Sequence, residues 1–251
     1  MYIQSNFIIQ EYIPIMNSYS ISIVTPIFNE EEIIESTLIK NIEILNSKKI
    51  DYEIIVIDDA SIDNSLIIIQ KLSKIYPIRL IAHQINLGFG GAIKSGIEAA
   101  KKDYILCLPA DSPLDNDIYF AFENNLGKAD LLVSYRIKRL GYTWWMILNS
   151  YIYHKLISIV YKMNLKDYNW IHLYRREIFQ ENKINIEYNS IFMLAEVLIK
   201  ARNNSNTFIE FPVNQTQRVT GEASAAKLKT ILNTLRDLIL FYPKNRSSKK
   251  L

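Results

Sequence analysis

The 251-residue sequence predicts an α/β protein in which a Rossmann-like, mostly parallel central sheet is flanked by helices. Short apolar runs rich in β-branched residues recur along the first half of the chain, and such runs are typical of strands that are buried on both faces. Helical patterns of apolar residues separate the runs, and the connections between them are short. This alternation of strands and helices is the signature of a doubly wound sheet.

The first half of the chain contains four of these apolar runs, and we expect one strand in each: residues 21–25, 53–57, 78–82 and 104–108. The expected helices lie between them, at about residues 31–46, 64–76 and 91–102. Asn29 is a candidate N-cap of the first helix, because its side chain can accept a hydrogen bond from a free backbone N–H. Glu30, Glu31 and Glu32 would then lie in the first turn, where the helix dipole favours negative charge.

The second half of the chain is less regular, and we expect two further strands and three helices: strands at 130–135 and 207–213, and helices at 144–163, 191–202 and 224–242. The helix at 144–163 is long enough to span a bilayer, but it contains Asn149, His154, Lys155 and Lys162. We interpret it as an amphipathic helix of a soluble or interfacial protein rather than as a membrane span. Without an internal repeat or a linker, one domain is expected at 21–243, between an N-terminal extension (1–20) and a basic tail (244–251).

Composition excludes several classes of protein. With 49% hydrophobic residues and a net charge of only +3, the chain is too apolar and too weakly charged to be disordered. Its one cysteine, Cys107, excludes an internal disulfide and a multi-cysteine zinc cluster. The N-terminus lacks the features of a secretory signal, so we expect a cytoplasmic protein. Lysine and arginine are dispersed and nearly balanced by acidic residues, which disfavours a nucleic-acid partner.

Charged side chains follow several of the expected strands. Glu30 comes after the first strand, Asp58 and Asp59 after the second, Asp111 after the fourth, and Arg136 after the strand at 130–135. Ligands of open α/β sheets bind beyond the carboxyl ends of the strands. Carboxylates at that edge can accept hydrogen bonds from a nucleobase or ribose, or hold a divalent ion on a diphosphate. Arginine suits a phosphate because its planar fork binds bidentately.

These charged loops also have ordinary interpretations. For Glu31 and Glu32 we favour helix capping, and Asp59 and Asp63 fit turn or cap positions about as well as a binding site. The glycines at 88–96 match neither the dinucleotide fingerprint, which Ile93 breaks, nor a P-loop, which needs a Lys-Ser/Thr pair. The three histidines have no recognisable nucleophile motif around them.

Taken in order, the loops resemble those of the inverting family 2 glycosyltransferases with the GT-A fold, and within that family the polyprenyl-phosphate hexosyltransferases such as dolichyl-phosphate mannosyltransferase. The matching pieces run through most of the chain: 25–30 (TPIFNE), 53–63 (EIIVIDDASID), 86–96 (NLGFGGAIKSG), 110–111 (AD), 134–136 (SYR), 173–176 (LYRR) and 218–222 (RVTGE). The resemblance implies a nucleotide-sugar-binding half at 21–136 and an acceptor half at 137–243.

The resemblance also implies roles for individual residues. The donor, a GDP- or UDP-sugar, would be bound by Pro26, Phe28, Glu30, Asp58, Asp59, Ala110 and Asp111. Asp111 matches the last carboxylate of the family's Asp-x-Asp motif, which holds Mg²⁺ or Mn²⁺ on the donor diphosphate. Arg136 and Arg218 match arginines that lie near phosphates of donor or acceptor. The expected catalytic residues are Asp111, Asp167 and Arg136.

Two departures from the family pattern bear on these roles. The first carboxylate of the Asp-x-Asp motif is replaced by Pro109, and Pro113 stands where a glutamine is common. This leaves open a metal site that is weaker, differently built or absent. The segment after Asp167 also differs from the family's run and is about one residue shorter, so it stays open whether Asp167 acts as a base.

The activity implied is transfer of one sugar, with inversion, to a polyprenyl phosphate such as dolichyl or undecaprenyl phosphate. Two alternatives are transfer to a saccharide hydroxyl in cell-surface polysaccharide synthesis, and a catalytically weak sugar-nucleotide-binding protein. The paired tryptophans at 144–145 and the basic tail, with Lys244, Arg246, Lys249 and Lys250, would suit contact with a membrane surface. Simple packing of both helices on the sheet is about equally favoured. If the tryptophans and the tail contact a membrane, we expect the protein to be peripheral on its cytoplasmic face.

Overall fold

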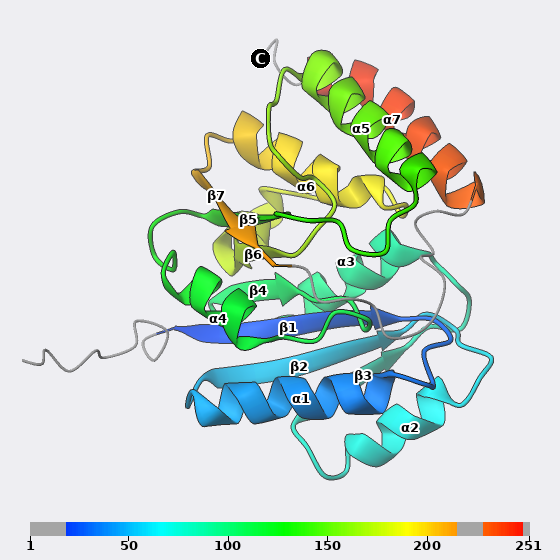
Figure 1. The fold of residues 1–251 in the computed structure, drawn as a ribbon, viewed down its shortest axis with the longest axis vertical. Coiled ribbons are helices and arrows are strands. Elements are labelled where there is room, and N and C mark those ends of the chain that lie inside the picture. Colours follow the sequence, from blue (N-terminus) through cyan, green and yellow to red (C-terminus); the bar gives the residue numbers. More distant parts are fainter. Residues whose placement is uncertain (1–18, 215–227, 248–251) are drawn as a thin grey trace, which may run out of the picture.

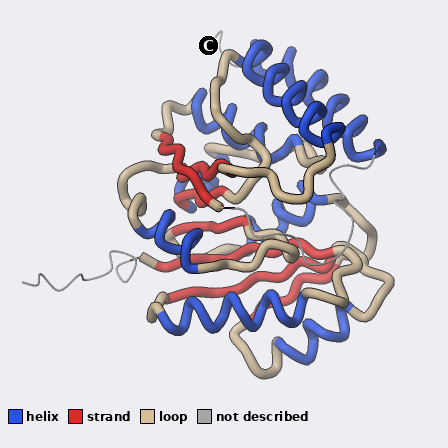
Figure 2. The backbone as a smooth tube through the Cα atoms, viewed as in Figure 1, coloured by secondary structure: helices blue, strands red, loops and turns tan. Residues whose placement is uncertain are grey.

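The computed structural model describes residues 19–214 and 228–247. Its centre is a seven-stranded sheet with the order β3-β2-β1-β4-β6-β5-β7 (Figures 1 and 2). The strands are β1 (Ser20–Ile27), β2 (Asp51–Asp58), β3 (Ile78–Ala82), β4 (Tyr104–Cys107), β5 (Leu131–Arg136), β6 (His172–Arg175) and β7 (Phe208–Val213). Helices cover both faces, so the structure has the expected α/β architecture with a mostly parallel sheet.

The described helices are α1 (Ile34–Ser47), α2 (Ser65–Leu72), α3 (Phe89–Ala99), α4 (Asn116–Glu123), α5 (Trp144–Tyr161), α6 (Phe192–Asn203) and α7 (Leu228–Ser247), with a 3-10 helix η2 (Arg176–Asn182). Figure 1 shows α1 and α2 on one side of β1 to β3 and α3 on the other. It also shows α5 and α7 together at the end of the molecule farthest from α1 and α2. Within the described residues, no helix combines the length and apolar character needed to cross a bilayer.

Strand direction decides where the functional loops meet. The register pairs β1 with β2 and β4, β2 with β3, and β5 with β7 in parallel, while β6 runs antiparallel to β4 and β5. Six strands therefore point the same way and end at one edge of the sheet. The antiparallel β6 begins at that same edge, which brings the residues before it to the loops that follow the other strands.

Two apolar layers hold the helices to the sheet, and alternate side chains of one strand enter opposite layers. Ile55 and Ile57 of β2 pack in the layer that contains α3, α5, α6 and α7. Ile54 and Val56 pack in the layer that contains α1, α2 and α4. Because both faces are covered, the strand reads as a continuous apolar run, which is why it could be predicted from sequence.

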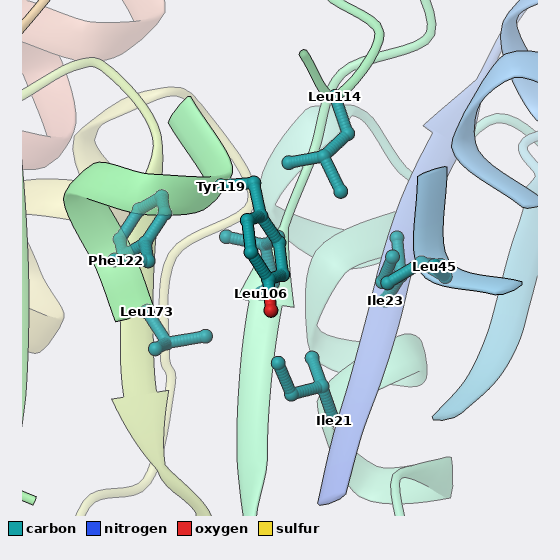
Figure 3. A pocket seen from close by; sticks show the side chains of 8 residues that line it. All are labelled: Ile21, Ile23, Leu45, Leu106, Leu114, Tyr119, Phe122 and Leu173. Carbon is teal, nitrogen blue, oxygen red and sulfur yellow. The ribbon is translucent and has the colours of Figure 1, made fainter. Parts of the chain in front are cut away.

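The second layer encloses a small apolar cavity of about 10 Å³ between β1, β4, β6 and the helices α1 and α4 (Figure 3). It is lined by Ile21, Ile23, Leu45, Leu106, Leu114, Tyr119, Phe122 and Leu173. A space of this size and lining is a minor packing defect and cannot hold a substrate.

Several sequence expectations need correction. Helix α1 begins at Ile34, and Asn29 is not its N-cap: its side chain instead accepts a hydrogen bond from the Ile62 N–H at 2.9 Å, across to the next loop. Glu30, Glu31 and Glu32 accordingly precede the helix. The elements β6, α4 and η2 were not expected from the sequence. Arg218 and the tail residues Lys249 and Lys250 lie outside the described residues.

Candidate active site

The loops after β1 and β2 brace each other. The Asn29 N–H donates to Ser61 Oγ at 3.0 Å. The Asn64 N–H and side-chain amide donate to Glu31 Oε2 at 2.9 and 2.6 Å. Asn64 is the N-cap of α2, so Glu31 supports the start of that helix rather than of its own. The two loops thus form one rigid rim, with the half-exposed Phe28 on it.

Two neighbouring carboxylates at the end of β2 have different surroundings. Asp59 is buried, and its oxygens accept from the Leu87 and Gly88 N–H groups, each at 2.8 Å, and pair with His83 Nδ1 at 2.7 Å. Both of its oxygens are thereby used inside the protein. Asp58 is also buried, but its Oδ1 has no hydrogen-bond partner among the described residues. A buried unpaired oxygen at a ligand-binding edge is a candidate contact for a bound molecule.

A Ser-His-Asp chain that the sequence did not indicate lies beside this loop. His83 bonds Asp59 through Nδ1 and approaches Ser95 Oγ with Nε2 at 3.0 Å. The Ser95 hydroxyl also lies 3.2 Å from the Gly91 carbonyl of the preceding turn, as a donor to it. A hydroxyl tied into its own helix is a structural link between α3 and the β2 loop, and we assign it no nucleophilic role.

The loop that carries Asp111 is held by α1. Thr37 Oγ1 donates to the Ala110 carbonyl and Asn41 Oδ1 accepts from the Leu114 N–H, both at 2.7 Å and both buried. Ala110 is itself buried, while Asp111 is partly exposed. Asp115 is the N-cap of α4 and accepts from the Ile118 N–H at 2.8 Å. It is therefore engaged in capping a helix.

The carboxylates of the described residues suit a metal ion that is bound mainly by the substrate. Within the described residues there is no group of three or more His, Cys, Asp or Glu side chains that could form a cage for a metal ion. Mg²⁺ is commonly bound by one or two carboxylates together with substrate phosphates and water. Asp111, partly exposed at the strand edge, suits an ion of that kind, held mainly by a diphosphate.

The most elaborate cluster at this edge is centred on Asp167, in the segment before β6. Asp167 Oδ2 accepts from Nε of Arg136 at 2.8 Å and lies 2.8 Å from its Nη2. Arg139 Nη2 lies 3.6 Å from the same oxygen, and His154 Nε2 lies 3.6 Å from Oδ1. The guanidinium of Arg136 also stacks over the ring of Trp170, 4.5 Å from its centroid.

Burial and charge act against each other in this cluster. Burial by itself would raise the pKa of Asp167, but Arg136, Arg139 and His154 together lower it below the usual value. Burial lowers the pKa of His154 to about 4, although Asp167 opposes that shift. At neutral pH the cluster therefore contains two guanidinium groups and one carboxylate, and it carries one net positive charge.

The structure brings most of the expected site residues to one edge and adds others. The last residues of β1 and the loop after it contain Pro26, Phe28 and Glu30, and the end of β2 contains Asp58, followed by Asp59. The loop after β4 contains Ala110 and Asp111. Arg136 is the last residue of β5, and Asp167 lies in the segment before β6. Sequence reasoning missed Arg139, His154 and Trp170. A signal existed for Arg139, since it lies three residues beyond Arg136, but His154 and Trp170 join only through the fold.

Carboxylates and arginines gather at the carboxyl edge of this α/β sheet, which is where such sheets bind their ligands. Comparison with protein families makes this specific. Residues 22–183 match glycosyl transferase family 2, and because the match covers more than half of the chain, the protein belongs to that family. It is a glycosyltransferase with the GT-A fold. A comparison with curated proteins gave no match.

The chain is similar in fold to solved structures of glucosyl-3-phosphoglycerate synthase from Mycobacterium tuberculosis. One, a complex with Mn²⁺, UDP and glucosyl-3-phosphoglycerate, gives a TM-score of 0.69 at 16% identity over 96% of this chain and 86% of that one. Another, with Mg²⁺ and UDP, gives 0.64 at 17% identity over 88% and 79%. At this identity the likeness establishes the fold alone.

Proposed function

We propose that the protein transfers a sugar from a nucleoside-diphosphate donor to a phosphate-bearing acceptor, a polyprenyl phosphate, with inversion at the anomeric carbon. The observation that carries the proposal is the cluster of the buried Arg136 and Asp167 with the partly exposed Arg139, which holds more positive than negative charge at the sheet edge. Arginine forks in this setting favour an anion with several oxygens.

The state of Asp167 also favours a phosphate acceptor. A sugar hydroxyl needs a base to remove its proton, whereas a phosphate is already ionised at neutral pH. Asp167 has a lowered pKa and is paired with Arg136, so it is poorly suited to take up a proton. Its role in the proposal is to position the two guanidinium groups, which orient the attacking phosphate oxygen.

On the donor side, we assign the nucleoside to the rim formed by Pro26, Phe28, Glu30 and Asp58, where Asp58 Oδ1 is unpaired among the described residues. Asp111 would hold a divalent ion on the donor diphosphate, and such an ion neutralises charge on the leaving group. Asp59 is buried and holds the 83–88 loop in place, so we assign it a positioning role. The polypeptide excludes water from Arg136 and Asp167, whose side chains are 4% and 2% exposed.

The structural neighbours are consistent with this assignment. Glucosyl-3-phosphoglycerate synthase has been crystallised with Mn²⁺, UDP-glucose and phosphoglyceric acid, a molecule that carries a phosphate. UDP-sugars and Mn²⁺ are therefore the first donor and ion to test. A second candidate function, a catalytically weak sugar-nucleotide-binding protein, is favoured by Pro109 alone, because it removes one carboxylate from the metal motif.

The test is a matrix of donors and acceptors. UDP- and GDP-linked hexoses are incubated, with Mn²⁺, Mg²⁺ or chelator, with a short-chain water-soluble prenyl phosphate, phosphoglyceric acid, or a saccharide alcohol. We expect the prenyl phosphate to cause release of nucleoside diphosphate, and the sugar of the product to have inverted configuration at its anomeric carbon. Turnover only with the saccharide alcohol or phosphoglyceric acid contradicts the lipid acceptor. A thermal shift with donor but no turnover with any acceptor favours the weak binding protein.

A further inference from the structure

More than half of the exposed large hydrophobic side chains in the described part of the chain lie on two helices, α5 and α7. On α5 they are Trp144, Trp145, Ile147, Leu148, Tyr151, Ile152 and Ile159, and on α7 they are Leu232, Ile239, Leu240 and Tyr242. Trp144 and Trp145 are 64% and 57% exposed and stack on each other with ring centroids 4.1 Å apart. Exposed apolar surface of this extent marks an interaction site.

This exposure follows from how α5 packs. Only Tyr153, Ile157 and Tyr161 of α5 are fully buried, a narrow stripe along its last turns. Tyr161 fastens the helix to α7, because its hydroxyl donates to the Leu238 carbonyl at 2.6 Å. The apolar side chains of this region therefore divide: Trp144, Leu148 and Ile152 are exposed, whereas Val160, and Met163 just after the helix, pack against the core.

The charged residues of α5 and α7 are mostly basic. Helix α5 contains no acidic residue, and its Lys155 is exposed. The sequence of α7 contains four basic residues and one acidic residue, Asp237, which is buried and accepts hydrogen bonds from Arg236. Exposed apolar side chains on two helices whose sequences are more basic than acidic complement an anionic lipid surface. A protein partner would require no such bias.

The same helix connects this face to the catalytic edge. His154 of α5 lies beside Asp167, and Ser150 of α5 accepts a hydrogen bond from Arg139. Tryptophan is suited to the boundary between lipid headgroups and water. A helix seated at that boundary by its tryptophans would hold the arginine cluster close to the headgroup phosphates.

We infer that α5 and α7 form a docking face for the surface of an anionic lipid bilayer, with Trp144 and Trp145 in the interface. The inference deepens the proposed function, since a polyprenyl phosphate presents its phosphate at that surface. Binding there would be reversible, and it would weaken as salt screens the basic groups.

The test is sedimentation of the full chain, without donor or acceptor, with vesicles of phosphatidylcholine alone or mixed equally with phosphatidylglycerol. We expect binding to the mixed vesicles, weaker binding at high salt, and a blue shift of tryptophan fluorescence. The double variant Trp144→Ser/Trp145→Ser should bind at least about tenfold less. The matched control Ile75→Ser removes an exposed apolar side chain just after α2 and should bind like the unaltered protein.

The inference is overturned if the unaltered protein fails to bind anionic vesicles, or if the double variant binds them equally well. It is also overturned if sedimentation velocity shows a dimer that the double variant dissociates, since the face would then cover a second copy. Measuring sugar transfer to the short-chain soluble acceptor separates the proposed function from the proposed membrane contact. Vesicle binding without transfer contradicts the proposed function alone, and transfer without vesicle binding contradicts this inference alone.

Discussion

Arg136 and Asp167 form a buried ion pair in which Nε and Nη2 of one guanidinium both lie 2.8 Å from the same carboxylate oxygen. Arg136 ends β5, whereas Asp167 precedes β6, and the antiparallel pairing of these two strands brings them together. The remaining oxygen, Oδ1, accepts from the Asn169 N–H at 3.1 Å. The carboxylate is thus fixed by its neighbours, and its negative charge offsets part of the charge of two arginines.

Asp167→Asn should destabilise the protein strongly and reduce binding of the phosphate acceptor. Removing the carboxylate leaves the buried Arg136 guanidinium uncompensated and takes away the partner of the partly exposed Arg139. Breaking a buried pair costs about 3–5 kcal/mol. Urea denaturation measures the loss, and steady-state kinetics should show a raised acceptor KM without a new pKa in the kcat profile. In an Arg136→Gln background the same substitution should cost much less. Equal costs in both backgrounds would contradict the coupling.

The buried His172 and the largely buried His154 should make the free energy of unfolding depend on pH below neutrality. Burial lowers the pKa of His154 and of His172 to about 4, from an ordinary value of 6.5. Between these values the unfolded chain binds protons that the folded protein does not, so the free energy of unfolding falls as pH falls. Each histidine contributes on the order of 1 kcal/mol per pH unit across this window.

His154→Gln should therefore remove roughly half of that histidine-dependent slope, measured by urea denaturation between pH 4.5 and about 7. Lys155→Gln, at the exposed neighbouring position, is the control and should keep the slope of the unaltered protein. Identical slopes in His154→Gln and the unaltered protein would show that His154 is not buried in its neutral form.

Sequence patterns predicted the first half of the fold well, because β1, β2 and β4 are buried on both faces and read as apolar runs. They missed β6, whose four residues are His172, Leu173, Tyr174 and Arg175. The strand is short and has a histidine and an arginine at its ends, and His172 Nδ1 lies 2.9 Å from the Tyr174 hydroxyl. A four-residue strand with polar residues at both ends has no apolar signature. By contrast, Asp115 gave a capping signal for α4 that could have been used.

The positions of the candidate site residues could be predicted only in part, and their roles stay predictions. Residues directly after parallel strands, such as Asp58 and Asp111, can be placed from sequence because parallel strands end at one edge. The neighbours of Asp167 depend on the antiparallel β6 and on the path of α5, which no local pattern specifies. The exposure of Trp144 likewise depends on the narrow packing of α5, so spacing alone indicated an amphipathic helix but not which face is covered.

Gly90→Ala should destabilise the start of α3. An added Cβ would lie 2.6 Å from the Tyr188 carbonyl oxygen and 2.7 Å from the Asn189 carbonyl carbon. That backbone cannot yield easily, because the Glu187 and Tyr188 N–H groups are held by Glu196 at 2.8 and 3.1 Å. Overpacking of this kind costs about 1–3 kcal/mol.

Thermal unfolding checks the Gly90 prediction, and Gly141→Ala is its control. Gly141 has φ +75° but nothing within 4 Å of an added Cβ, so it tests backbone strain without crowding. Its cost should be about 1 kcal/mol. If the Gly90 variant is no less stable than the Gly141 variant, the segment that contains Asn189 does not pack against α3 as described.

Asp111→Asn should lower kcat/KM by about 10²–10³-fold and weaken the response to Mn²⁺, because the amide lacks the charge that holds an ion on the diphosphate. Asp111 Oδ1 accepts from the Ser112 hydroxyl at 3.4 Å, and an asparagine oxygen can accept the same bond, so thermal stability should change little. Asp115→Ala is the matched control: it removes the α4 cap and should cost about 1 kcal/mol of stability while leaving the Mn²⁺ midpoint unchanged. Titration of activity with Mn²⁺ measures both midpoints. A shifted Mn²⁺ midpoint in Asp115→Ala with none in Asp111→Asn would indicate that Asp115 rather than Asp111 binds the ion. That result would contradict the proposed donor site.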